Sequence, residues 1–277
     1  MTRQIEPFDW QPLETRRLWD WIGSRPQMQQ TYFTFNAGQG LVGFLACAGL
    51  LRGKALDYGC GPGFLAGMLA AAGLETHGAD YSPKSIRQAE ERLAGKANWQ
   101  GAKLIDSQAI PFPDHSFDLV TCIETLEHVP ETGLPALIAE LKRVLKPGGV
   151  LLLTTPHEED LRANMNYCPF CDTEFHRWQH LRSWNTTEVE KVIEAGGLIP
   201  LLLIATDFSN FQNPVRLPAW QALSIAKLRD WINFSLMQAL DRYKPRPFLQ
   251  GREFMFRLGN GHGPSLCVLA TKQGTAT

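Results

Sequence analysis

Seven short apolar runs, separated by segments with a helical pattern, set the strongest limit on how this chain can fold. They read KALDYG, LETHGAD, AKLID, FDLVTCIE, GGVLLLTTP, LIPLLLIATD and SLCVLATK. Strands that alternate with helices need crossover connections, and these build a doubly wound, mostly parallel α/β sheet. A chain of 277 residues is long enough for one such domain. We therefore expect a single domain over residues 1–277 with a seven-stranded sheet.

Two helix ends are visible in the sequence. The segment LKRVLKPGG predicts the end of a helix. Its last helical turn is basic, and Pro147 and the two glycines at its end cannot continue the helix. The segment NTTEVEKVIEAGG predicts a helix that begins with a capping box from Thr187 to Glu190 and ends at Gly196.

Composition limits the partners and the compartment. The chain has 27 basic and 28 acidic residues, so no overall charge attracts it to nucleic acid. Six cysteines are spread along apolar segments, which is typical of cytoplasmic proteins and not of a disulfide framework. No apolar run approaches the length of a transmembrane helix, and no signal peptide is visible. We expect a soluble, cytoplasmic protein.

A glycine-rich turn, ALDYGCGPGF, follows the first predicted strand. Alternate glycines at 59, 61 and 63 leave the backbone bare, so that a ligand can approach it closely. The dinucleotide fingerprint needs a third small residue where this chain has Phe64, and a phosphate-binding P-loop needs a Gly-Lys-Ser/Thr that is missing. The turn therefore argues against a nicotinamide-dependent reductase and against a nucleotide triphosphatase.

Four segments in order resemble the class I S-adenosylmethionine (SAM)-dependent methyltransferases. They are DYGCGPG, then HGADYS, then LIDSQAIPFPDHSFDLVTCIETLEHVP, and finally LKRVLKPGGVLLLTTP. The segment TCIETLEHVP is similar to the corresponding segment of small-molecule O-methyltransferases of quinone pathways. The resemblance covers residues 38–208 and 265–277 and implies a Rossmann-like core there. Residues 1–50 would form an N-terminal helical cap, 157–184 a loop containing Cys and His, and 209–264 a helical insertion.

The resemblance implies SAM as the methyl donor and a set of donor-binding residues. Asp80 would accept the ribose hydroxyls and Asp106 the adenine amino group. Asp57 would place negative charge near the cationic donor, or would accept a hydrogen bond from a helix N-terminus, and the two roles are compatible. The donor-binding residues that we expect are Asp57, Gly59, Gly61, Gly63, Asp80, Tyr81, Asp106, Ser107 and Ile123.

The expected activity is methyl transfer to an oxygen or nitrogen of a small-molecule acceptor. The segment ETLE stands where nucleic-acid methyltransferases carry Asn/Asp-Pro-Pro and an aromatic residue, which disfavours nucleic acid. The alternative is a non-catalytic binding protein that retains the donor fold. The sequence predicts neither the acceptor nor an oligomeric state.

Candidate catalytic groups follow the fourth and fifth predicted strands. Ligands lie beyond the carboxyl ends of parallel strands, so Glu124 and His128 after the fourth strand and His157 after the fifth should border the reaction. Methyl transfer needs positioning, exclusion of water and, for some acceptors, a base. A phenol that ionises readily needs no strong base. We expect His157, His128 or Glu124 to act as that base.

The segment CPFCDTEFHRWQH contains four candidate metal ligands with C-x2-C-x4-H-x3-H spacing. They are Cys168, Cys171, His176 and His180, which could close a tetrahedral zinc site if the histidines share one face of a helix. The alternative is a loop whose histidines serve the active site. The segment HLRSWN is similar to a methyltransferase stretch that places His180 near the acceptor. Both alternatives stay open.

The two flanking regions also allow alternatives. Tyr32, Phe33 and Phe35 could line an acceptor pocket or pack a helix against the sheet edge. The 209–264 insertion contains a long amphipathic segment with basic residues after it. It suits an acceptor pocket, a dimer interface, a helix buried on both sides or peripheral contact with a membrane.

Overall fold

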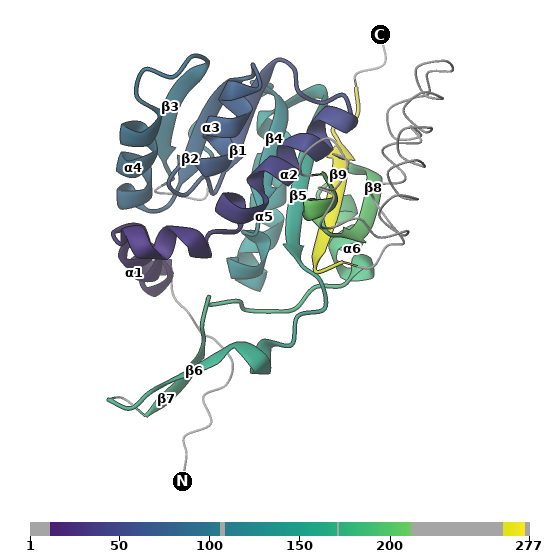
Figure 1. The fold of residues 1–277 in the computed structure, drawn as a ribbon. Helices are drawn as coiled ribbons and strands as arrows, with labels where there is room; N and C mark the ends of the chain where they lie inside the picture. The colour runs from purple at the N-terminus through teal and green to yellow at the C-terminus, as the bar shows by residue number, and fades with distance from the viewer. Residues whose placement is uncertain (1–11, 106–108, 171, 212–262, 275–277) are drawn as a thin grey trace, which may run out of the picture.

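The expected seven-stranded α/β sheet is confirmed in a computed structural model, which describes residues 12–105, 109–170, 172–211 and 263–274. The strand order is β3-β2-β1-β4-β5-β9-β8 (Figure 1). The first five of these strands pair in parallel, whereas β9 is antiparallel to both β5 and β8. The strands are β1 Lys54–Tyr58, β2 Glu75–Asp80, β3 Trp99–Leu104, β4 Phe117–Ile123, β5 Leu145–Pro156, β8 Ile199–Thr206 and β9 Ser265–Thr271.

Helices cover both faces of the sheet, and two separate apolar cores result. Along β9, Leu266 and Val268 belong to one core and Cys267 and Leu269 to the other, because successive strand side chains point to opposite faces. Helices α5 and α6 close the first core, and helices α2 and α3 close the second. The main helices are α1 Pro12–Gly23, α2 Phe33–Cys47, α3 Phe64–Ala71, α4 Pro83–Leu93, α5 Leu134–Val144 and α6 Thr186–Ala195.

The capping box of α6 lies two residues earlier than the sequence indicated. The side chain of Asn185 accepts a hydrogen bond from the backbone N–H of Glu188 at 3.0 Å. The Glu188 carboxylate in turn accepts the backbone N–H of Asn185 at 3.2 Å. The predicted box from Thr187 to Glu190 is therefore wrong, because Asn185 already satisfies the first orphan N–H groups of the helix.

The 157–184 region contains a hairpin of strands β6 Met165–Cys168 and β7 Thr173–His176, which projects from the body of the sheet (Figure 1). His176 ends β7 and is paired with Met165, while His180 lies in the loop before α6. The expected helix that would place these two histidines on one face is thus not formed. Short 3-10 turns also occur at η1 Pro26–Thr31, η2 Leu126–His128, η3 Glu131–Gly133, η4 Leu161–Asn164 and η5 Phe208–Phe211.

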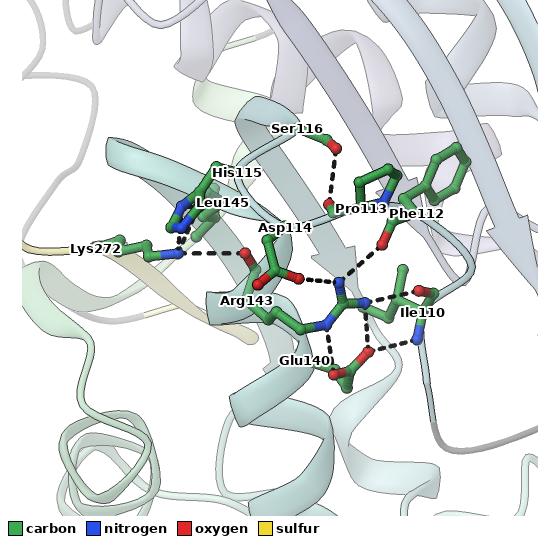
Figure 2. A network of polar contacts seen from close by, with 10 residues as sticks. All are labelled: Ile110, Phe112, Pro113, Asp114, His115, Ser116, Glu140, Arg143, Leu145 and Lys272. Atoms are coloured by element: carbon green, nitrogen blue, oxygen red, sulfur yellow. Dashed lines mark hydrogen bonds and ion pairs between the residues drawn. The ribbon is translucent and has the colours of Figure 1, made fainter.

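A polar network fixes the segment between β3 and β4 to helix α5 (Figure 2). The guanidinium of Arg143 donates to the carbonyls of Ile110 and Phe112 at 2.8 and 2.9 Å, and to the Asp114 carboxylate at 2.7 Å. Glu140, one turn earlier on α5, accepts hydrogen bonds from Arg143 and from the backbone N–H of Ile110. The network anchors the chain just after residues 106–108, which lie outside the described residues.

The structure describes most of the region before β1 but little of the region between β8 and β9. Helix α1, the turn η1 and helix α2 precede β1, where the helical cap is expected. Most of the expected 209–264 insertion, from 212 to 262, lies outside the described residues. Within the described segments, no helix has both the length and the apolar character needed to cross a bilayer.

Candidate active site

The strand order reverses between β1 and β4, which lie side by side in the middle of the sheet. Open parallel sheets bind ligands beyond the carboxyl ends of the strands at such a switch point. The glycine turn follows β1, and Glu124 follows β4. The candidate site is therefore at this edge, in agreement with the sequence-based expectation of its position.

Asp80 ends β2 and its carboxylate faces the glycine turn. Its Oδ2 accepts the N–H of Gly61 at 2.8 Å, and its Oδ1 accepts the N–H of Ser82 at 2.7 Å. Burial raises the pKa of Asp80 to about 6, against the effect of these two N–H donors. A carboxylate has lone pairs left for two ribose hydroxyls. The geometry is therefore compatible with the predicted ribose-binding role.

The glycines of the turn make close contacts with the protein itself. Gly59, Gly61 and Gly63 all have positive φ angles. A Cβ at Gly61 would lie 3.1 Å from the ring of Tyr32, and a Cβ at Gly63 would lie 3.1 Å from side chains of α4. Close packing of α4 and of the N-terminal cap thus explains these two glycines without a ligand. The turn offers its backbone N–H groups to a donor only where Tyr32 does not cover them.

Phe64 joins the glycine turn to two neighbouring elements. Its ring lies 5.9 Å from that of Tyr32 and 5.2 Å from that of Phe35, centroid to centroid. The Arg92 guanidinium lies 4.3 Å above the Phe64 ring and donates to the carbonyl of Pro62 at 3.0 Å. Phe64 therefore packs the start of α3 against the cap and α4, which a glycine at this position could not do.

Asp57 lies near the end of β1 and is 2 % exposed. The hydroxyl of Thr121 donates to its Oδ1 at 2.8 Å. Burial raises the pKa of Asp57 to about 7, against the effect of this hydrogen bond. A cation beside this carboxyl, such as a sulfonium, would favour its ionised form.

The remaining predicted donor residues differ in their surroundings. Tyr81 is 45 % exposed and Ile123 is 5 % exposed at the end of β4. Asp106 and Ser107 lie outside the described residues. Phe33, expected as a possible pocket residue, packs edge-on against Phe208 at 6.3 Å.

Glu124 adopts a strained backbone conformation directly after β4. Its φ angle is +46°, a left-handed value that is rare for residues with a side chain and often found at functional sites. Its backbone N–H donates to the carbonyl of Thr154 at 3.0 Å, and the hydroxyl of Thr154 donates to its carboxylate at 2.8 Å. Burial raises the pKa of Glu124 despite this hydroxyl.

Glu127 and His128 lie in the 3-10 turn η2 beside Glu124. Glu127 is fully buried; the hydroxyl of Thr155 donates to its Oε2 at 3.0 Å, and its Oε1 has no hydrogen-bond partner among the residues that the structure describes. Burial, followed by the nearby charge of Glu124, raises the pKa of Glu127. Burial and then His180 lower the pKa of His128 to about 3, so its ring is neutral at physiological pH.

The three predicted catalytic residues do not share one environment. His128 packs edge-on against His180 at 4.9 Å and against Trp19 of α1 at 5.3 Å, centroid to centroid. His157, after β5, lies with its Nδ1 3.3 Å from the carbonyl of Gly263. Glu124 and His128 therefore belong to one cluster at the ends of β4 and β5, and His157 lies beside the chain that enters β9.

Two neighbouring groups bring carboxylate and histidine atoms within 4.8 Å of one another. The first is Glu127, His128 and His180, and the second is Glu159, His176 and His180. Neither Glu127 nor Glu159 was predicted as a site residue from the sequence. Glu127 directly precedes His128, and this adjacency is the one local sequence signal for it. The sequence around Glu159 contains no comparable signal.

Hydrogen bonds decide which group can bind a metal ion. His176 Nδ1 accepts the backbone N–H of His180 at 3.0 Å, so its Nε2 carries the proton and cannot coordinate an ion. His128 Nδ1 lies 3.3 Å from the carbonyl of Gln179, which can only accept, so His128 Nε2 has the lone pair. Glu127, His128 and His180 therefore fit a divalent cation, whereas the group containing His176 does not.

The proposed zinc ligands are not gathered in the described part of the hairpin. His176 is paired with Met165 and Cys168 with Thr173, which separates Cys168 from His176 by three residue pairs. Three steps along a strand span about 10 Å, too far for two ligands of one ion. His176 and His180 do lie together, with ring centroids 4.6 Å apart. Cys171 lies outside the described residues.

Comparison with known proteins supports the fold. Residues 56–153, which include the glycine turn, Asp80 and the Glu127–His128 turn, match the family model described as a methyltransferase domain. This segment, which runs from β1 to β5, is thus similar to a methyltransferase domain. The resemblance inferred from the sequence is thereby confirmed.

Relatives of this chain include enzymes named for quinone chemistry. The ubiquinone biosynthesis O-methyltransferase of Thiobacillus denitrificans is 35 % identical over 108 residues, which are 37 % of this chain and 44 % of that protein. The 2-methyl-6-phytyl-1,4-hydroquinone methyltransferase of Synechocystis is 27 % identical over 209 residues, or 74 % of this chain and 64 % of that protein. The chain thus spans less than two thirds of the length of either relative.

A solved structure supports the fold across almost the whole length of the chain. A chain from a complex between the Haloferax volcanii Trm112 methyltransferase activator and a methyltransferase superposes with a TM-score of 0.58 at 17 % identity. The superposition covers 92 % of this chain and 97 % of that chain. At this identity the likeness shows a shared fold.

Proposed function

We propose that the protein transfers a methyl group from SAM to a hydroxyl oxygen of a small molecule. The observation that carries the proposal is the cluster of Glu124, Glu127 and His128, which lies at the switch point next to the glycine turn and Asp80. On this proposal, the donor-binding and proton-accepting groups share one edge of the sheet. The relative from Thiobacillus denitrificans is named an O-methyltransferase, which supports oxygen over nitrogen as the methylated atom.

On this proposal, the donor would bind at the β1 side of the site. Asp80 would accept the ribose hydroxyls, and Asp57 would favour the positively charged donor through its buried carboxylate. The ring of Tyr32 packs on Gly61, so it would have to shift for a donor to rest against the turn. Tyr32 and Trp19 of the cap would then exclude water from the donor and from His128.

Proton transfer would take place at the ends of β4 and β5. The attack of the hydroxyl oxygen on the activated methyl carbon is an in-line displacement, which releases the hydroxyl proton. Among the three predicted catalytic residues we favour His128, because its Nε2 lone pair is fixed by the Nδ1 contact with Gln179. Glu124 would hold the turn in place through Thr154.

Glu127, His128 and His180 would hold a divalent cation, if one takes part. Such an ion lowers the pKa of a hydroxyl that binds it and orients its oxygen. The unpartnered Oε1 of the fully buried Glu127 supports this assignment over the zinc set of Cys168, Cys171, His176 and His180.

The acceptor class that we propose is a phenol or hydroquinone with an ionisable ring hydroxyl. The names of both relatives refer to quinone-type compounds, and a phenol that ionises readily needs no strong base. The alternative, a binding protein without catalysis, keeps the donor site but needs no proton-accepting cluster.

Incubation with methyl-labelled SAM and a panel of catechols, phenols and amines tests the proposal. We expect a labelled phenol ether with the wild-type protein, and at least tenfold less product with His128→Ala, in line with the usual contribution of a general base. The same incubation with a metal chelator distinguishes the two mechanisms: a chelator lowers the amount of product only if a metal ion takes part. Intact donor binding without any labelled product in the panel or in a metabolite extract would favour the non-catalytic alternative.

A further inference from the structure

Glu159 lies between two buried histidines outside the donor site. It follows β5, and its Oε2 accepts a hydrogen bond from Nδ1 of His180. Its Oε1 lies 3.5 Å from Nε2 of His176. The side chain of Glu159 is only 13 % exposed, and His176 is fully buried. One carboxylate thus faces His176 at the end of β7 and His180 in the loop that follows.

The protons on these rings can be assigned from their partners. A carboxylate facing a ring nitrogen favours a proton on that nitrogen, so neutral His180 carries its proton on Nδ1. Its Nε2 then has the lone pair. His176 has the opposite tautomer, because its Nδ1 accepts the backbone N–H of His180 at 3.0 Å and its Nε2–H faces Glu159. The three residues therefore form an ordered arrangement with one available lone pair, on His180.

The charge of Glu159 supports this arrangement. Burial alone would raise the pKa of Glu159, but the contacts with His176 and His180 outweigh it and hold the pKa well below its usual range. The carboxylate therefore stays ionised; it accepts a hydrogen bond from His180 Nδ1 and its other oxygen lies 3.5 Å from His176 Nε2. An ionised acceptor binds N–H groups more strongly than a neutral one.

The lone pair of His180 belongs to a ring that contacts the proposed catalytic cluster. His180 packs edge-on against His128, with centroids 4.9 Å apart. A ring nitrogen of His180 also lies within 4.8 Å of Glu127 and His128 atoms that could bind an ion. The orientation of His180 therefore bears directly on His128, whether His180 binds an ion or shares the acceptor proton.

We propose that Glu159 is a positioning residue that fixes His180 as the Nδ1–H tautomer, so that the Nε2 lone pair of His180 serves the site around His128. The assignment of the tautomer depends only on hydrogen bonding. The expected effect on kinetics depends, in addition, on the proposed function. Hydrogen-bond partners behind a functional histidine typically change activity or metal affinity by about 10- to 100-fold when they are removed. Glu159 thus couples the loop after the hairpin to the reaction site.

A purely structural role for Glu159 makes a different prediction. Its Oε1 also accepts a hydrogen bond from the side-chain amide of Asn164 at 2.9 Å, and this contact anchors the 3-10 turn η4. If anchoring were its function, Asn164→Ala would reproduce the effect of Glu159→Ala. The neighbouring Glu158 is exposed, so Glu158→Gln controls for the loss of a charge in the same segment.

Nitrogen-15 correlation spectra of the histidine side chains test the proposal directly. The His180 signal is assigned by its loss in His180→Gln. We expect Nδ1–H in the wild type, in Asn164→Ala and in Glu158→Gln, and a shift toward Nε2–H in Glu159→Ala. Glu159→Gln, which keeps a neutral acceptor, provides a second variant with less disruption, and circular dichroism checks the fold of each. An unchanged His180 tautomer in Glu159→Ala, or Nε2–H in the wild type, overturns the inference.

Kinetics supply the second readout. We expect Glu159→Ala to lower kcat by about 10- to 100-fold with little change in KM for the donor, whereas Asn164→Ala keeps both. Equal losses in Glu159→Ala and Asn164→Ala would show that anchoring explains the effect and would overturn the positioning role. If the wild type itself transfers no methyl group, the proposed function fails, and the tautomer measurement still decides the role of Glu159.

Discussion

Replacing Asp57 with Asn should make the stability of the protein less dependent on pH. Asp57 is 2 % exposed, and burial raises its pKa to about 7 against the hydrogen bond from Thr121. A carboxyl with a higher pKa in the folded state than in the unfolded chain binds its proton more tightly when folded. The resulting stability is fully present below the unfolded pKa and is lost as the pH rises toward 7.

The size of the effect follows from the shift. A change in pKa from 3.8 to about 7 corresponds to roughly 4 kcal/mol in total, of which roughly 2–3 kcal/mol falls between pH 5 and pH 8. Asn removes the ionisation and keeps an oxygen that can accept from Thr121. Between pH 5 and pH 8, the free energy of unfolding should therefore fall in both proteins by different amounts. The fall in the wild type should exceed the fall in Asp57→Asn by roughly 2–3 kcal/mol.

Urea unfolding at the two pH values measures this difference. Asp118→Asn is a suitable control, because Lys146 and the N–H of Lys54 lower the pKa of Asp118 although burial raises it. Asp118 stays ionised throughout the interval, so this variant should keep the pH dependence of the wild type. Equal pH dependence in the wild type and Asp57→Asn would refute the assignment of a raised pKa to Asp57.

Three further substitutions test the packing that positions the site. Gly63→Ala should destabilise the protein by about 1–3 kcal/mol, because its Cβ would lie 3.1 Å from α4, and more than Gly73→Ala, whose Cβ would meet open space. Phe44→Ala should cost about 3–5 kcal/mol, since Phe44 is fully buried in the core beneath α2. Thr121→Val should cost about 1–3 kcal/mol near neutral pH by leaving Asp57 without its hydroxyl donor. Denaturant unfolding measures all three.

These three predictions can each fail in a distinct way. Equal losses in Gly63→Ala and Gly73→Ala would mean that backbone strain, not contact with α4, explains the first. A loss below about 1 kcal/mol in Phe44→Ala would show that the core collapses around the cavity. If the Thr121→Val protein is as stable as the wild type, the hydrogen bond from the Thr121 hydroxyl does not stabilise Asp57.

The sheet could be predicted from the sequence because its signals are local. All seven apolar runs form strands, since each run is long enough to be buried and is bounded by turn residues. The capping box was misplaced because Asn185 and Thr187 both suit a helix start, and the local sequence does not decide between them; in the structure Asn185 caps the helix.

The candidate site was predictable only in part, because its chemistry depends on contacts between distant segments. The glycine turn and Asp80 lie close in sequence and have a strong motif, whereas Glu159 and His180 meet across a hairpin. The spacing of Cys168 and His176 was read as a ligand set because no sequence rule shows that β6 and β7 pair in a register that separates them. Hydrogen-bond partners, and hence histidine tautomers, are visible only in the structure.

The central claim is that the edge of the sheet beside Asp80 binds the methyl donor. Calorimetric titration with S-adenosylhomocysteine tests it most directly, with Glu75→Gln as a control at the opposite end of the same strand, β2. Charged hydrogen bonds contribute about 1.5–3 kcal/mol each, so Asp80→Ala should weaken binding by at least about tenfold, while Glu75→Gln should bind like the wild type. Unchanged affinity in a folded Asp80→Ala protein would contradict the account.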